Sequence, residues 1–234
     1  MKHTSILLFL LFAATGLHAQ SLPFDNERLD YSIRHNLFPG TIGTMRFQGK
    51  PVAEGYQVDA VLKAAVGSIY TLDCNYGANF RTDAGLTPLS ATRSQVEKKY
   101  WAKGRYDWSA PGKVHLDVTK STRPPRNETL EWNGTVRDLL ATIWWLRTLD
   151  YDSSQPAPGH NALLLDHDAL PVVIASYTRK NIKWNGVQTP VIEVVLAHEG
   201  KEALRMTLQD DARRTPLKFS IALSFGNIKG TLKQ

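Results

Sequence analysis

The chain has 234 residues, 42% of them hydrophobic, and a chain of this length can bury a real core without disulfides or metals to stabilise it. Its formal net charge is +6, but the positive charges are scattered and no long basic run occurs, so a nucleic-acid-binding tail is excluded. Cys74 is the single cysteine, which excludes an intramolecular disulfide; we expect its thiol to be buried and inert.

Residues 1–19 have the pattern of a secretory signal peptide. Lys2 gives a positive start, Ile6 to Ala14 form an uncharged apolar run, and Ala19 offers a small residue for cleavage. The apolar run is too short to cross a bilayer core of about 30 Å. We expect cleavage after Ala19 and export to the periplasm or cell envelope, with no transmembrane segment in the mature chain. The expected partners are therefore lipid, glycan or envelope protein, and not nucleic acid.

Most of the remaining chain alternates apolar and polar residues, the pattern of strands with one buried face. The clearest runs are Leu29–Ile33, Tyr56–Val66, Tyr70–Tyr76, Val114–Val118 and Leu217–Phe225. Turn signals separate the runs, among them Pro39-Gly40, Pro111-Gly112, Pro124-Pro125 and Asn185-Gly186. Asn185-Gly186 is the best two-residue hairpin turn, because both residues tolerate positive φ.

One segment has helical spacing instead. Thr135 to Asp138 has the form of a capping box, with Asp in place of the usual Glu. The apolar residues that follow recur at three- and four-residue spacing: Leu139, Leu140, Ile143, Trp144, Leu146 and Leu149. The spacing predicts a helix over about 136–150 with a wide apolar face, and Trp145 lies outside that face. Such a helix is expected to pack against a sheet.

Together these patterns predict an all-β, mainly antiparallel fold with one central helix. We expect about a dozen strands in a large curved sheet or open barrel, with the helix against the concave side. A closed up-and-down barrel is the main alternative, and a two-sheet sandwich is the next. We expect residues 20–234 to form a single domain.

Several segments resemble an exported bacterial family, the domain of unknown function 3108. They are Leu29–Ile33, Leu37–Gly40, Arg137–Leu140, Trp144–Arg147, Leu208–Leu217 and Gly226–Leu232. The resemblance covers about residues 25–232. It implies a β-rich periplasmic or cell-envelope protein of a Gram-negative bacterium, and it brings no catalytic residues to this chain.

Arg147 is the first candidate binding residue, because it falls inside the apolar face of the predicted helix. A guanidinium there must pair with a carboxylate or reach water, since burial of an unpaired charge costs several kcal/mol, on the order of the stability itself. It is either an anion clamp at the mouth of a cavity, a fixed ion pair with the Asp210-Asp211 segment, or a solvated head. The aromatic residues Trp144, Trp145, Trp108 and Tyr106 are further candidates for lining a ligand pocket.

No motif in the sequence indicates catalysis or a cofactor. His160, Asp166, His167 and Asp168 are the nearest approach to a metal site, but neighbouring strand residues face opposite ways and the spacing matches no known zinc motif. The adjacent carboxylates Asp210-Asp211 suit a charged turn better than a glycosidase pair. We therefore predict no cofactor, no metal and no enzyme activity.

These observations favour a non-catalytic envelope protein that binds a hydrophobic or amphiphilic ligand in the concave sheet. The alternative is a structural or interaction protein of the envelope with a polysaccharide or outer-membrane partner, and a hydrolase ranks third. An apolar pocket above about 300 Å³ beside the helix would favour ligand binding. A filled interior with an exposed aromatic patch would favour a partner surface.

Overall fold

The computed structural model describes residues 22, 24, 26–68, 70–83, 85–154, 156–157, 159–165, 168–223 and 226–233. The predicted signal peptide and its cleavage site lie outside the described residues. So do Asp166 and His167, two of the four candidate metal ligands.

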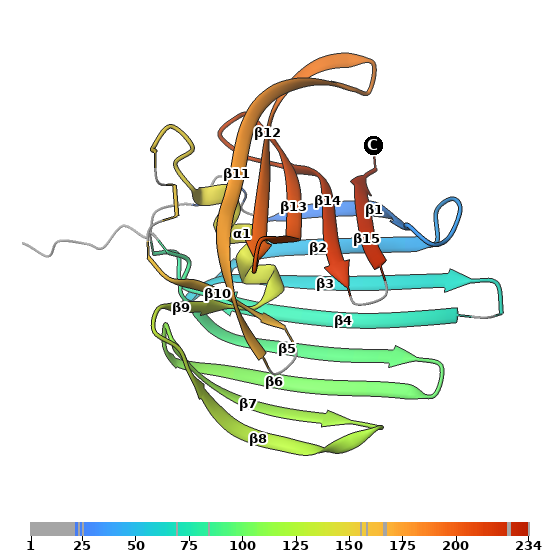
Figure 1. Ribbon diagram of the computed structural model, residues 1–234, viewed down its shortest axis with the longest axis vertical. Helices are drawn as coiled ribbons and strands as arrows, with labels where there is room; N and C mark the ends of the chain where they lie inside the picture. Colours follow the sequence, from blue (N-terminus) through green and yellow to red (C-terminus); the bar gives the residue numbers. More distant parts are fainter. Residues whose placement is uncertain are drawn as a thin grey trace, which may run out of the picture.

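The described chain forms one continuous sheet of 15 strands and one helix (Figure 1). The first eight strands are β1 (Glu27–His35), β2 (Gly43–Val52), β3 (Gly55–Val66), β4 (Tyr70–Phe80), β5 (Pro88–Glu97), β6 (Tyr100–Ala110), β7 (Lys113–Lys120) and β8 (Arg123–Glu131). The remaining elements are β9 (Thr135–Arg137), α1 (Leu139–Thr148), β10 (Asn161–Leu165), β11 (Asp168–Trp184), β12 (Val187–His198), β13 (Lys201–Gln209), β14 (Pro216–Leu223) and β15 (Gly226–Leu232). The all-β prediction is confirmed, and the predicted dozen strands were too few.

The sheet consists of two antiparallel meanders joined at their middle. Strands β1 to β8 each pair with the next, strands β10 to β15 do the same, and β15 pairs with β1. The chain therefore reaches one edge of the sheet at β8, passes to the other edge at β9, and returns strand by strand to its start. Pairing of β9 with β10 is parallel because α1 forms the crossover between them.

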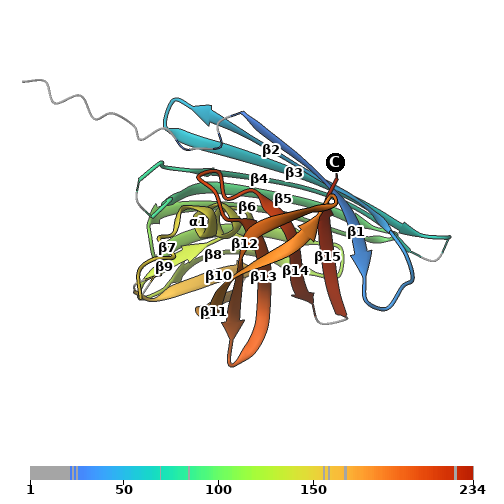
Figure 2. The same cartoon turned by 90° about the horizontal axis from the view of Figure 1, so that it is seen from above.

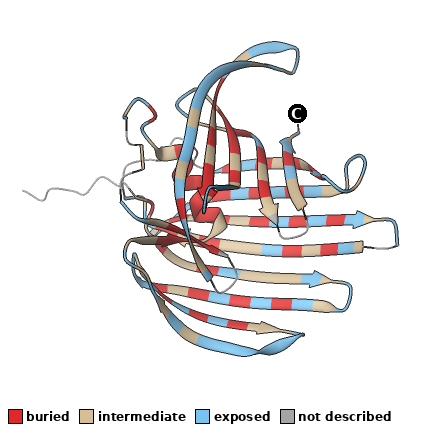
Figure 3. Ribbon diagram, viewed as in Figure 1, coloured by how far each residue is buried: buried red, intermediate tan, exposed pale blue. Residues whose placement is uncertain are grey.

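The two meanders curve over one another with α1 between them, and the sheet stays open at β8 and β9 (Figures 1 and 2). This arrangement matches the open curved sheet with a helix on its concave side. Buried and exposed residues alternate along the strands, most regularly in β3, β6 and β7 (Figure 3). The inward-facing residues of the strands and the helix make one core.

The helix is shorter than predicted, and its cap is a different residue. Asp138, and not Thr135, is the N-cap: its carboxylate accepts hydrogen bonds from the backbone N–H groups of Leu140 at 2.8 Å and Ala141 at 3.2 Å. The capping-box prediction was wrong because Thr135 to Arg137 are extended and pair with β10 as strand β9. An Asp at the N-cap satisfies two of the backbone donors that every helix start leaves open.

Two turn predictions had opposite outcomes. The Asn185-Gly186 hairpin is confirmed, with φ of 51° and 83° and with Trp184 paired to Val187 across the turn. Pro124-Pro125 is not a turn: both residues lie inside the exposed edge strand β8. Proline is tolerated at an edge, where a missing N–H removes no necessary ladder bond, and it discourages further strands from pairing there.

Candidate functional site

The concave face of the sheet has a filled end, around α1. Trp144 is fully buried there, and its ring lies edge-on to Phe24 at 6.4 Å and to Phe47 at 5.5 Å between ring centroids. Ile143 and Leu146 are also buried. Side chains therefore occupy the space between the two meanders at the helix.

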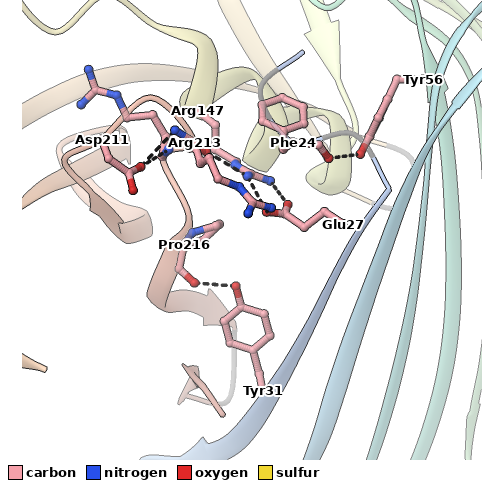
Figure 4. A network of polar contacts seen from close by, with 9 residues as sticks. Phe24, Glu27, Tyr31, Tyr56, Arg147, Asp211, Arg213 and Pro216 are labelled. Atoms are coloured by element: carbon pink, nitrogen blue, oxygen red, sulfur yellow. Dashed lines mark hydrogen bonds and ion pairs between the residues drawn. The ribbon is translucent and has the colours of Figure 1, made fainter. Parts of the chain in front are cut away.

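Arg147 lies in this filled end as a buried ion pair (Figure 4). Its Nη1 and Nη2 donate to the two carboxylate oxygens of Glu27 at 2.6 and 3.0 Å, and Nη2 also donates to the Arg213 carbonyl at 3.0 Å. Its guanidinium carbon lies 4.1 Å from the centroid of the Phe24 ring. The bidentate geometry and the stacking compensate the charge that the helical pattern placed among apolar residues, while the buried Nε–H has no hydrogen-bond partner among the described residues.

Of the three alternatives for Arg147, the structure shows the fixed ion pair, but its partner is not the Asp210-Asp211 segment. The carboxylate comes from Glu27 on β1, which is 120 residues away in sequence. Asp211 instead accepts from the backbone N–H groups of Arg213 and Arg214, and forms its own turn. Only the Arg213 carbonyl of that segment reaches Arg147.

Two tyrosines, one on β1 and one on β3, donate hydrogen bonds to backbone carbonyls in the filled end. Tyr31 donates its hydroxyl to the Pro216 carbonyl at 2.5 Å, and Tyr56 donates to the Phe24 carbonyl at 2.6 Å (Figure 4). Burial raises the pKa of Tyr31 far above its usual value, with a small opposing effect of the Arg147 charge. The Tyr31 hydroxyl therefore stays a neutral donor to the Pro216 carbonyl at any ordinary pH.

The remaining aromatic candidates are also packed into the interior. Trp108 donates its indole N–H to the Val136 carbonyl at 3.0 Å. Tyr106 is buried over Gly104, where an added Cβ would meet the phenol oxygen at 2.6 Å. Trp145 was expected outside the buried face, and that expectation was wrong. It is 5% exposed, with the Arg137 guanidinium 4.3 Å from its ring centroid.

At the other end the concave face is hollow. A cavity of about 280 Å³ lies between β1, β3, β4 and β15, away from α1. Its walls are almost wholly apolar, formed by Ile33, Ile42, Leu62, Ala64, Leu72 and Ile228. We call this space the apolar pocket. It lies just below the 300 Å³ that is typical of small-molecule sites, and not beside the helix as expected.

Further side chains from β1, β4, β5 and the β1–β2 connection complete the apolar pocket. Leu37 and Phe38 come from the connection between β1 and β2, and Tyr70 and Glu97 come from β4 and β5. His35 lines it too: its Nδ1 accepts from the Leu37 N–H at 3.2 Å, and its ring lies 5.4 Å from the Phe38 ring. Burial raises the pKa of Tyr70 to about 12, and the Glu97 charge adds to this.

A polar strip separates the apolar pocket from the filled end. Along β4 and β5, Cys74 is paired with Gln95 and Tyr76 with Arg93, all on the inner face next to Leu72. Arg93 donates a hydrogen bond to Gln95. Burial raises the pKa of Cys74 to about 11, so its thiol is protonated at neutral pH.

Two of the four candidate metal ligands, His160 and Asp168, lie in the described part of the chain. His160 offers its backbone carbonyl to the Thr135 N–H at 2.9 Å, and Asp168 opens β11. Among the residues that the structure describes, no three His, Cys, Asp or Glu side chains lie together as metal ligands would. In the same part of the chain, no helix is both long and apolar enough to cross a membrane.

Sequence reasoning found the strands that line the apolar pocket but not the pocket. Ile33, Leu62, Ala64 and Leu72 are all inward members of the alternating runs. Ala64 is small among larger neighbours, but the inward Ala60 on the same strand is equally small and lies outside the pocket lining, so no signal in the sequence singles out the hollow.

The fold and the pocket define a class: an open, β-barrel-like protein whose interior is filled by a helix at one end and hollow at the other. The chain belongs to the family described as protein of unknown function (DUF3108), whose model matches residues 30–233. It is also similar to the crystal structure of a β-barrel-like protein of the domain of unknown function DUF1849 from Brucella abortus. That match has a TM-score of 0.56 and 13% identity, and it covers 88% of this chain and 95% of the other. No curated protein matches the chain.

Proposed function

We propose that this protein is an exported, non-catalytic envelope protein that binds the apolar part of a single-chain amphiphile in the apolar pocket. The observation that carries the proposal is the pocket itself, about 280 Å³ with nearly continuous aliphatic walls. Burial of apolar surface is worth roughly 25 cal/mol per Å², so such walls favour a hydrocarbon over water. A space of this size suits one chain and excludes a bulky multi-chain lipid.

The few polar groups suggest how an amphiphile would lie. Glu97 and Tyr70 line the apolar pocket at the ends of β5 and β4, where the sheet meets solvent. The aliphatic residues Leu62 and Leu72 lie further along the inner face. We propose that the chain enters past Glu97 and that the head group stays at this polar end.

Export supports an envelope ligand. The pattern of residues 1–19 is that of a cleaved signal peptide. Fractionation of cells that express the full chain should place the protein beyond the inner membrane, with Gln20 at its amino terminus. An intact Met1 terminus on protein in the cytoplasm would contradict this part of the proposal.

Titration with a fluorescent single-chain probe, dansyl-undecanoic acid, tests the pocket. The parent protein should bind the probe saturably, and Ala64→Phe should weaken binding by at least about tenfold because the new ring fills the space. Val61→Phe is the matched control, since Val61 lies on the same strand but is 37% exposed and lines no part of the pocket. Equal binding by both variants would refute pocket binding.

A structural or interaction role is the second candidate, and one feature favours it. The hairpin of β11 and β12 projects from the body of the sheet, because β13 pairs with β12 only from Val191 onward (Figure 1). An isolated two-stranded ribbon is marginal in water, so a partner that covers it would stabilise it. Loss of a co-purifying envelope protein on shortening this hairpin, with no probe binding by the parent, would favour this role.

A further inference from the structure

Three segments of the first meander lie at the end of the sheet where the apolar pocket lies, with the adjoining ends of β3 and β4 between the first segment and the second. Strands β1, β5 and β7 run in the same direction within the first meander, so their carboxyl termini lie at the same end of the strands (Figure 1). The connections that follow these ends, taken with the strand residues next to them, are residues 36–42, 96–101 and 120–123. We call these three segments together the pocket rim.

The pocket rim exposes large apolar side chains. Leu37 is 64% exposed, Val96 is 50% exposed and Trp101 is 39% exposed. Val96 and Trp101 are direct partners across β5 and β6, and their side chains lie together on the outer face of the sheet, because the neighbouring Gln95 and Glu97 face inward. Exposed apolar residues gathered at one edge indicate a contact with something other than water.

The same segments are basic. They contain Lys98, Lys99, Lys120 and Arg123, and Glu97 is their single acidic residue. The two basic turns are joined, because the Trp101 N–H donates to the Ser121 hydroxyl at 3.1 Å and the Ser121 N–H donates to the Trp101 carbonyl at 2.9 Å. Positive charge is therefore concentrated beside the exposed apolar residues.

We propose that the pocket rim docks on the surface of a membrane that contains anionic phospholipid. Lysine and arginine near such a surface are attracted by its negative potential, and tryptophan prefers the boundary between head groups and acyl chains. An anionic polysaccharide would account for the basic residues but not for Leu37, Val96 and Trp101. A lipid surface accounts for both.

The position of the apolar pocket fits this docking. Leu37 and Glu97 belong both to the pocket rim and to the pocket lining. A docked molecule would therefore present the pocket to the lipid, and an acyl chain could enter without crossing water. The docking itself depends only on the pocket rim, and does not require that the pocket hold a chain.

Vesicle flotation of the mature protein tests the docking. Vesicles of phosphatidylglycerol and phosphatidylethanolamine should bind it, and vesicles of phosphatidylcholine alone should not. Binding should weaken as salt rises from about 0.1 M to about 0.5 M, because the charges are screened. Lys98→Gln with Lys99→Gln should reduce affinity by about thirtyfold, and Leu37→Ser with Trp101→Ala should also reduce it severalfold.

The hairpin of β11 and β12 supplies matched controls, because Lys183 and Val187 are exposed there and Val187 is 66% exposed. Lys183→Gln and Val187→Ser should leave flotation unchanged. Equal flotation on neutral vesicles, loss caused by the control variants, or unchanged binding by Leu37→Ser with Trp101→Ala would each overturn the proposal. Ala64→Phe separates the two proposals: it should weaken probe binding by at least about tenfold and leave flotation intact.

Discussion

The two ends of the concave face are built from the same alternating strands and have opposite properties. At the filled end, α1 and the aromatic residues Phe24, Phe47 and Trp144 occupy the space between the meanders. At the hollow end no helix intervenes, and aliphatic side chains such as Ala64 and Leu72 leave a cavity. One sheet therefore has a filled end that stabilises the fold and a hollow end with space for a ligand.

The polar contacts follow the same division. The filled end contains the ion pair of Arg147 with Glu27, and the hydrogen bond of Tyr31 to Pro216 spans 185 residues. Such contacts join the first meander to the second. The apolar pocket instead has a few polar groups near its solvent-facing end. The filled end should therefore dominate the free energy of unfolding, and the hollow end should dominate ligand affinity.

Removal of Glu27 should have the largest effect. Glu27→Gln leaves the buried Arg147 guanidinium without its carboxylate, which should lower the free energy of unfolding by about 3–5 kcal/mol. Urea denaturation followed by tryptophan fluorescence measures this. The double variant Glu27→Leu with Arg147→Met should cost less than Glu27→Gln alone, because it buries no unpaired charge. A single variant as stable as the parent would mean that the pair contributes nothing to the fold.

Addition of a large side chain should cost much more stability at the filled end than at the hollow end. Ala141 on α1 is fully buried in the filled end, so Ala141→Phe should cost about 3 kcal/mol. Ala64→Phe adds the same group where a cavity of about 280 Å³ can receive it, and should change stability by less than about 1 kcal/mol. Thermal denaturation of both variants makes the comparison. Similar losses of stability in Ala141→Phe and Ala64→Phe would show that the apolar pocket is not free space.

The N-cap of α1 should make the filled end sensitive to pH. Burial raises the pKa of Asp138 to about 6 from an ordinary 3.8, although the N–H groups of Ala141 and Leu140 and the charge of Arg137 oppose the rise. Between these two pH values the folded chain holds a proton that the unfolded chain has released. The stability from this group is therefore full below about pH 4, and is lost as pH rises through 6.

Asp138→Asn should remove that pH dependence, on the order of 2 kcal/mol between pH 4 and pH 7, while its side-chain carbonyl still caps the helix. The measurement is urea denaturation of parent and variant across this range. An unchanged slope in the variant would assign the pH dependence to another group.

The sequence predicts the parts of this fold that local pattern determines. Period-two runs such as Tyr56–Val66 gave the strands and their inward faces, and the Asn185-Gly186 turn followed from its tolerance of positive φ. The partner of Arg147 could not be predicted, because it depends on which strand lies next to the helix in space. Trp145 was misplaced because β9 and β10 pack against α1 in addition to the first meander, so the helix buries more than one face.

The apolar pocket was beyond prediction for a related reason. A cavity is a small difference between the space that the backbones enclose and the volume of the side chains that fill it. Leu72 at the hollow end and Leu62 beside it have the same pattern in the sequence as inward residues of the filled end. Only the position of α1 decides which inward residues meet another layer and which meet empty space.

Cys74 lies between the filled end and the hollow end. The rate at which a reagent labels its thiol therefore measures how readily this part of the sheet opens. Its side chain is 1% exposed and burial raises its pKa to about 11, so a disulfide reagent should label it slowly at pH 8. If the hollow end stays closed until the whole protein unfolds, the labelling rate in increasing urea should follow global unfolding measured by fluorescence. Labelling much faster than unfolding would show that β4 and β5 open by themselves. Saturation with dansyl-undecanoic acid should then slow the labelling, because the bound chain would hold the inner face of β4 closed beside Leu72.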